Sequence, residues 1–230
     1  MARSTATRSS AVALGIGVAA ALFWHGEARG VPEGGPGAAG AREGRILLHA
    51  EAPPLGHTGG FGEPTCVICH IGDDENAYGG SVSILGLPEA YEPGAIYALT
   101  VVLGAEETTV AGFQLSARFS EGETAGGSAG ELAPVSPRVE VKAGENGVAY
   151  AHQNVAGSPA QRPDGSVWLV EWTAPESDDA VVFHVAANSG NGDNSPLSDL
   201  VYRAEVRVQG GRRRSRTITG GRRRCPGLSR

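Results

Sequence analysis

Short runs of β-branched and aromatic residues recur every 10 to 20 positions from about Ser81 onward. Clusters of Gly, Pro, Asn or Asp separate these runs, which is the pattern of strands joined by turns. Alternation such as Tyr97, Leu99 and Val101 on one face indicates strands that bury one side. No segment of comparable length has a helical period. The strands we expect are 81–87, 96–103, 110–119, 148–152, 167–173, 181–187 and 200–208.

This strand pattern restricts the fold class. Seven or so strands over about 130 residues, without internal repeats or parallel crossovers, point to an antiparallel sandwich. The composition agrees, since 35 Gly and 14 Pro favour turns, and an aromatic content of 6% favours a modest core. We therefore predict an all-β protein whose single domain is an antiparallel, immunoglobulin-like β-sandwich.

The N-terminus has the layout of a secretory signal peptide. Two arginines precede an apolar run at 11–24, and Gly26 and Ala28 supply the small residues of a cleavage site. A run of about 14 residues is short for a bilayer span, so an uncleaved anchor is the less favoured alternative. We expect residues 1–28 to be removed and the chain to be exported to the periplasm, cell surface or extracellular space. No other segment has the length and apolarity of a membrane span.

Two further segments lack a core-forming pattern. Residues 29–56 are rich in Gly, Ala, Pro and Glu and are predicted to be a flexible linker. Residues 209–230 hold eight Arg and no acidic residue, and are predicted to be a disordered tail. Without these Arg the chain has 11 Lys and Arg against 25 Asp and Glu, a net charge of minus 14. The predicted domain, 57–208, is therefore a poor partner for a nucleic-acid backbone.

One motif carries chemistry: Cys66, Val67, Ile68, Cys69 and His70. Two thiols at this spacing can each bond one vinyl group of a haem, and the following imidazole can then ligate the iron. We predict one covalent haem c, attached through Cys66 and Cys69, with His70 as a metal ligand. A structural disulfide between the two Cys, or a site for zinc or another metal, are the alternatives.

The sixth ligand of such an iron is open from the motif alone. The only Met is Met1, which leaves with the signal peptide, so methionine ligation is excluded. The remaining candidates are His49, His57, His152 and His184.

An ordered series of residues extends beyond the motif. It consists of Gly62, Glu63, CVICH, Gly79 to Val82, Gly86 to Pro88, Tyr91, Pro93, Gly94, Tyr97, Leu99, Gly112 to Leu115, Tyr150, His152, Trp168, Trp172, Ala174, Pro175, Phe183, Ala187, Asn188 and Asn191. With this series, residues 58–202 resemble the choice-of-anchor V domain family, exported bacterial domains distantly similar to the Reeler domain of reelin.

The resemblance implies a Reeler-like β-sandwich with an N-terminal haem-binding loop. It also implies Cys66 and Cys69 as attachment points, His70 as proximal ligand and His152 as the second metal ligand. Two departures are Gly60 and Phe61, where the family commonly has Ala and Pro, and the absence of an apolar anchoring segment at the end of the chain. Surface anchoring is therefore left open.

We expect a haem protein that transfers electrons, or senses a redox state or ligand, at the cell envelope, with an unidentified redox or surface partner. The alternative is a non-enzymatic surface or adhesion module in which Cys66 and Cys69 form a structural disulfide. An enzyme is less favoured, because it would need an open coordination site and a distal acid or base. No phosphate loop of the Gly-x-x-x-x-Gly-Lys-[Ser/Thr] type is present.

Overall fold

The computed structural model describes residues 52–77 and 79–211. The predicted signal peptide, most of the linker and nearly all of the tail lie outside these residues. Within them are two short 3-10 helices, η1 (Cys66–Ile68) and η2 (Val155–Gly157), and ten strands. The strands are β1 (Ser81–Leu85), β2 (Ala90–Tyr91), β3 (Ile96–Gly104), β4 (Val110–Phe119), β5 (Glu131–Pro134), β6 (Val139–Ala143), β7 (Ala149–Gln153), β8 (Gly165–Thr173), β9 (Val181–Gly190) and β10 (Leu200–Gly210).

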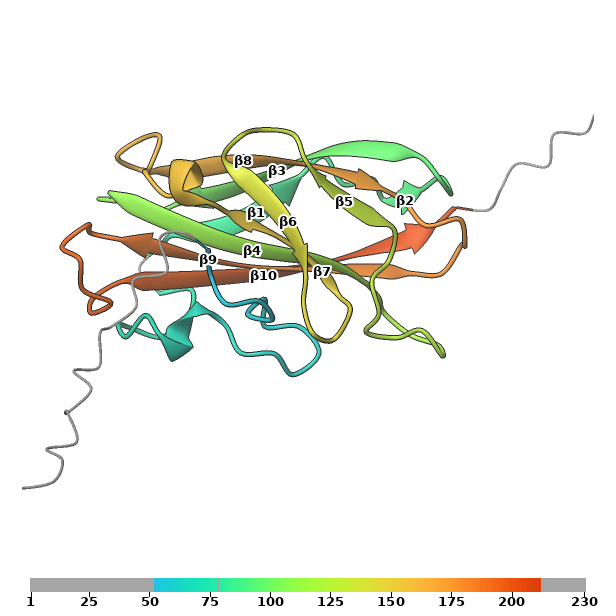
Figure 1. Ribbon diagram of the computed structural model, residues 1–230, viewed down its shortest axis with the longest axis horizontal. Helices are drawn as coiled ribbons and strands as arrows, with labels where there is room; N and C mark the ends of the chain where they lie inside the picture. Colours follow the sequence, from blue (N-terminus) through green and yellow to red (C-terminus); the bar gives the residue numbers. More distant parts are fainter. Residues whose placement is uncertain (1–51, 78, 212–230) are drawn as a thin grey trace, which may run out of the picture. The chain divides into compact units, whose positions relative to one another are not determined.

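The strands form two sheets packed face to face (Figure 1). The four-stranded sheet has the order β1-β3-β8-β5, and the six-stranded sheet has the order β2-β10-β9-β4-β7-β6. All neighbours are antiparallel except β2 and β10, which pair in parallel over two residues. The predicted all-β, antiparallel sandwich is confirmed.

The seven predicted strands correspond to β1, β3, β4, β7, β8, β9 and β10, whereas β2, β5 and β6 were not predicted. β2 has only two residues, and β5 and β6 are edge strands of their sheets. β5 contains Pro134, and β6 carries the charged residues Glu140 and Lys142 on its second face, as is common at sheet edges. At the other end, β10 continues to Gly210, past the expected limit of the domain.

The core lies between the two sheets and contains both tryptophans of β8. Trp168 stacks on Phe113 with ring centroids 4.6 Å apart, and Trp172 meets Phe183 edge-on at 4.8 Å. Each indole nitrogen donates to a backbone carbonyl, Trp168 to Gly157 at 3.0 Å and Trp172 to Ala129 at 2.9 Å. These rings therefore stabilise the interior of the sandwich rather than form a binding surface.

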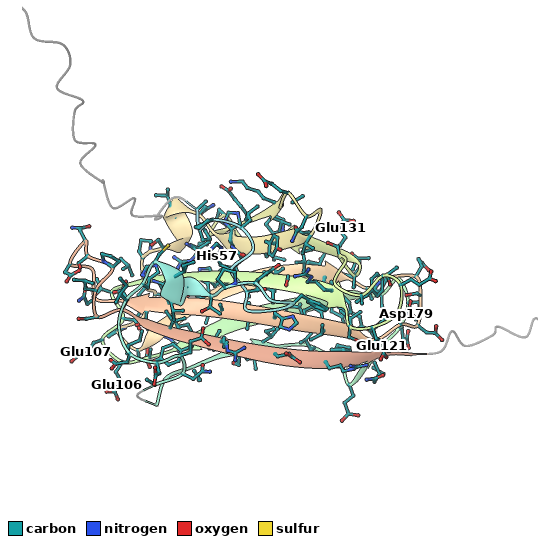
Figure 2. All side chains as sticks on the ribbon, turned by 90° about the horizontal axis from the view of Figure 1, so that it is seen from below. His57, Glu106, Glu107, Glu121, Glu131 and Asp179 are labelled. Carbon is teal, nitrogen blue, oxygen red and sulfur yellow. The ribbon has the colours of Figure 1, made fainter. Side chains whose placement is uncertain are left out.

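The outer face of the six-stranded sheet is covered as well. Along β4, residues Gln114, Ser116 and Arg118 face away from the core and are nonetheless buried. Their cover is the segment before β1, residues 52–77, coloured blue to teal in Figure 1; Figure 2 looks onto this side, where His57 is labelled. β9 is consequently buried along nearly its whole length. None of the helices formed by residues 52–77 and 79–211 has the length and apolarity needed to cross a membrane.

Candidate functional site

The motif forms one compact turn on the outer face of the six-stranded sheet. The backbone N–H groups of Cys69 and His70 both donate to the carbonyl of Cys66, at 3.1 and 2.9 Å. Thr65, the residue before η1, is buried and its hydroxyl donates to the carboxylate of Glu75. This turn fixes the backbone of the segment that holds Cys66, Cys69 and His70.

The two thiols of this turn differ in their surroundings. Both are free thiols; Cys66 is half-buried and Cys69 is exposed. Burial raises the pKa of the Cys66 thiol to about 12, with the nearby Cys69 and Glu75 acting in the same direction. A redox-active CxxC pair needs a thiol whose pKa is lowered. The raised pKa of Cys66 is therefore opposite to that of a thioredoxin-like site.

Backbone hydrogen bonds hold the end of the motif to the connection between β9 and β10. The N–H of Ile71 donates to Pro196 at 2.8 Å, and the N–H of Ser198 donates to Ile71 at 2.9 Å. Five residues further on, the N–H of Asn76 donates to Val201 on β10 at 2.9 Å. The motif is therefore fixed to the sandwich at the point where β10 begins.

The side chain of His70 contacts the residue that precedes β10. Its Nδ1 lies 2.6 Å from Oδ2 of Asp199, the residue that precedes β10. The side chain of Asp199 is 5% exposed and that of His70 is 29% exposed. With Nδ1–H donating to the carboxylate, the lone pair of His70 lies on Nε2. Metal-binding histidines commonly use this arrangement, with the second nitrogen donating to a carboxylate or carbonyl.

Exposed apolar side chains surround the turn. Val67 and Ile68 lie within the motif, Ile71 follows it, and Leu197 is the bridge partner of Ile71. Together these four residues place aliphatic surface beside an exposed thiol and an accessible imidazole. Grouped exposed apolar side chains commonly mark a binding surface.

A buried carboxylate anchors the chain just before the motif. Glu63 accepts hydrogen bonds from Thr58 Oγ1 at 2.6 Å, Tyr150 OH at 2.5 Å and Arg118 Nη1 at 2.6 Å. Burial opposes ionisation of Glu63, but the bonds from Thr58 and Tyr150 and the charge of Arg118 outweigh it, so its pKa is lowered. Burial and the bond to Glu63 raise the pKa of Tyr150 to about 12. This network attaches the segment to β4 and β7.

The structure does not bring His152 to the motif. His152 lies fully buried on β7, and register pairs connect it through Gln114 and Ala186 to Arg203 on β10. Asp199 lies four positions before Arg203 in the chain. With strands about 4.8 Å apart and about 3.3 Å per residue, His152 and Asp199 are separated by roughly 20 Å. Two imidazoles on one metal need nitrogens within roughly 4 Å, because each metal–nitrogen bond is about 2 Å.

The other candidate histidines also have local partners. Ring nitrogen Nε2 of His184 lies 3.1 Å from Glu205, and Nδ1 of His57 lies 3.2 Å from the carbonyl of Leu55. Nδ1 of His152 lies 2.7 Å from the carbonyl of Gln153. Burial lowers the pKa of both His152 and His184. His49 lies outside the described residues.

Residues 52–77 and 79–211 contain no group of three or more His, Cys, Asp or Glu side chains arranged to hold a metal ion. A c-type haem does not require such a group, since the chain supplies two thioether bonds and an axial nitrogen. Sequence reasoning did not find Asp199, which is 129 residues from His70. Glu63 was noted only as part of the ordered series, and the sequence carries no sign of its partners.

Comparison of the sequence with protein-family models and with curated proteins finds no match. Among solved structures, the reeler domain of human F-spondin is 19% identical, over 60% of this chain and 93% of that domain, with a TM-score of 0.42. The Reelin-N domain of F-spondin is 18% identical, over 64% and 96%, with a TM-score of 0.43. A cohesin module of a Clostridium perfringens family 33 glycoside hydrolase is 16% identical, over 57% and 96%, with a TM-score of 0.38.

With TM-scores this low, no property of these solved structures is transferred to this chain. The all-β sandwich rests on the strands and sheets described above. Membership of the choice-of-anchor V family stays a prediction.

Proposed function

We propose that this chain is an exported β-sandwich protein carrying one covalent haem c on Cys66 and Cys69, with His70 as axial ligand. Its role would be electron transfer, or sensing of a redox state or small ligand, at the cell envelope. The observation that carries the proposal is the bond between His70 Nδ1 and Asp199 Oδ2 at 2.6 Å. This bond leaves Nε2 of His70 as the nitrogen that can ligate iron.

The donor set and its surroundings fit the group. Cys66 and Cys69 are free thiols three positions apart, and His70 follows them directly. The exposed side chains of Val67, Ile68, Ile71 and Leu197 offer aliphatic surface to an apolar macrocycle. Haem in this place would supply one-electron chemistry or ligand binding at iron, while the chain would supply attachment, the axial nitrogen and partial exclusion of water.

Covalent attachment is the property to test. The full chain is expressed in a bacterial host with a cytochrome c maturation system, then analysed by denaturing electrophoresis with haem staining and by intact mass. We expect haem on the wild type and severe loss on Cys66→Ala, Cys69→Ala and His70→Ala, because attachment and ligation use all three groups. Cys225→Ala is the matched control and should keep full loading, since Cys225 is outside the motif.

Three outcomes would contradict this assignment. Unstained wild type, together with Cys225→Ala protein that is two mass units lighter than its reduced chain, would identify a disulfide between Cys66 and Cys69 and favour the adhesion-module alternative. Unstained wild type with reactive thiols would exclude both readings. Full, stoichiometric haem on His70→Ala would remove His70 as the axial ligand.

A further inference from the structure

The contact between His70 and Asp199 joins residues that lie 129 positions apart in the chain. Asp199 is almost completely buried, and its Oδ1 has no hydrogen-bond partner within the described residues. Its Oδ2 is therefore the oxygen through which this buried carboxylate is stabilised, by a short bond of 2.6 Å to His70. A buried carboxylate with a single strong partner is costly to desolvate, so its retention calls for a role.

We infer that Asp199 is the positioning residue for His70: it fixes the Nδ1–H tautomer, aims Nε2 outward and increases the electron donation of the imidazole. This inference rests on the proposed function, because it concerns the same axial ligand. Hydrogen bonds to ionised acceptors are shorter and stronger than neutral ones, and the low local dielectric strengthens them further. A more electron-rich axial nitrogen stabilises the oxidised iron, so Asp199 holds the reduction potential low.

The backbone is arranged to let these two side chains meet. A Cβ atom on Gly72 would lie 2.2 Å from the carbonyl oxygen of Asp199, and a Cβ on Gly190 would lie 3.2 Å from its Oδ1. Both glycines therefore allow close approach of the motif segment and the start of β10. The paired bonds of Ile71 with Pro196 and Ser198 hold the same junction from the backbone side. The contact is built by several elements rather than by two mobile side chains.

The first test needs no haem. Nitrogen-15 NMR of the apoprotein reports which ring nitrogen of His70 carries the proton. We expect the Nδ1–H tautomer in the wild type and a mixture of both tautomers in Asp199→Ala. Asp164→Asn is the control, since Asp164 is an exposed partner of Arg162, and it should leave the His70 signal unchanged.

Gly72→Ala provides an independent route to the same result, because it separates the motif from Asp199 while keeping both side chains. It should also return His70 to mixed tautomers. An Nδ1–H tautomer that persists in both Asp199→Ala and Gly72→Ala, each with a native-like spectrum for the sandwich core, would overturn the inference.

The second test uses the haem-loaded protein and Asp199→Asn, which preserves size and one acceptor but removes the charge. We expect at least a tenfold shift in the ratio of reduced to oxidised protein, equivalent to about 59 mV toward positive potential for a one-electron couple. An unchanged potential with normal haem loading would refute the role of Asp199. If the wild type takes up no haem, the proposed function fails, whereas the tautomer experiment still decides the positioning role.

Discussion

Replacing Glu63 with Gln removes one negative charge from a buried network and changes almost nothing in size. The side chains of Glu63 and Arg118 are only 11% and 8% exposed, and their charged atoms lie 2.6 Å apart. Glu63 also accepts hydrogen bonds from Thr58 and Tyr150. The variant leaves the guanidinium of Arg118 buried without its counter-charge, and it supplies one carbonyl oxygen where three donors converge.

Removing one partner of a buried ion pair typically costs about 3 to 5 kcal/mol. For a domain of this size each kcal/mol lowers the unfolding midpoint by about 2 to 4 °C, so Glu63→Gln should lower it by roughly 6 to 20 °C. The matched control is Glu121→Gln. Glu121 pairs with Arg207 at 2.8 Å, but its side chain is 68% exposed. Loss of such a surface pair should cost less than about 1 kcal/mol.

The assay is urea unfolding of wild type and both variants, repeated across pH. The pKa of Glu63 is lowered in the folded state from an ordinary value of 4.5. The stabilisation from its ionised form is therefore complete above about pH 4.5. It disappears as the pH falls through the lower pKa that Glu63 has in the folded protein. The difference in the free energy of unfolding between wild type and Glu63→Gln should accordingly become smaller below about pH 4.5. Two results would refute the stabilising role of the Glu63 network. One is a loss of unfolding free energy in Glu63→Gln that is no larger than the loss in Glu121→Gln, and the other is a loss that does not depend on pH.

Two other predictions concern His152 and the C-terminal tail. In haem-loaded protein, His152→Ala should leave the iron absorption spectrum unchanged, because His152 lies roughly 20 Å along the sheet from Asp199, the partner of His70. A change from low-spin to high-spin would identify His152 as the sixth ligand after all. A chain that ends at Gly211 should unfold at the same temperature as the full chain, since it keeps all of β10, which ends at Gly210, and the bond from the N–H of Gly211 to Tyr91. A midpoint many degrees lower in calorimetry would show that the removed residues stabilise the fold.

The strands that could be predicted are those with a strong apolar alternation. β3 and β8 alternate because one face packs in the core, and β4 and β9 place apolar side chains such as Phe113, Leu115 and Phe183 on their inner face. β5 and β6 have only four and five residues, and β5 contains Pro134, so these short edge strands give too weak a local signal to be found this way. Their position depends on pairing with β8 and β7, which no local window contains.

The residues of the site also differ in whether a local stretch of sequence identifies them. Cys66, Cys69 and His70 are recognisable because their chemistry requires a fixed order within five residues. Asp199 is not recognisable in the sequence, because its contact with His70 exists only once the end of β9 and the start of β10 have folded. The implied role of His152 as second metal ligand would require the outer face of the six-stranded sheet to be free for a haem. Residues before the motif cover that face, and nothing in their Gly-rich and Pro-rich composition indicates such docking.

The long-range partners that hold the motif segment all follow it in the chain. The bonds of Glu63 to Arg118 and Tyr150 join residues 55 and 87 positions apart. The bond of His70 to Asp199 joins residues 129 positions apart. Contacts of such sequence separation form late, because the intervening chain must first be ordered. While the chain folds, the thiols of Cys66 and Cys69 are consequently accessible until β10 is added. This folding order would allow Cys66 to be modified before the sandwich is complete. In the finished sandwich the Cys66 thiol is half-buried.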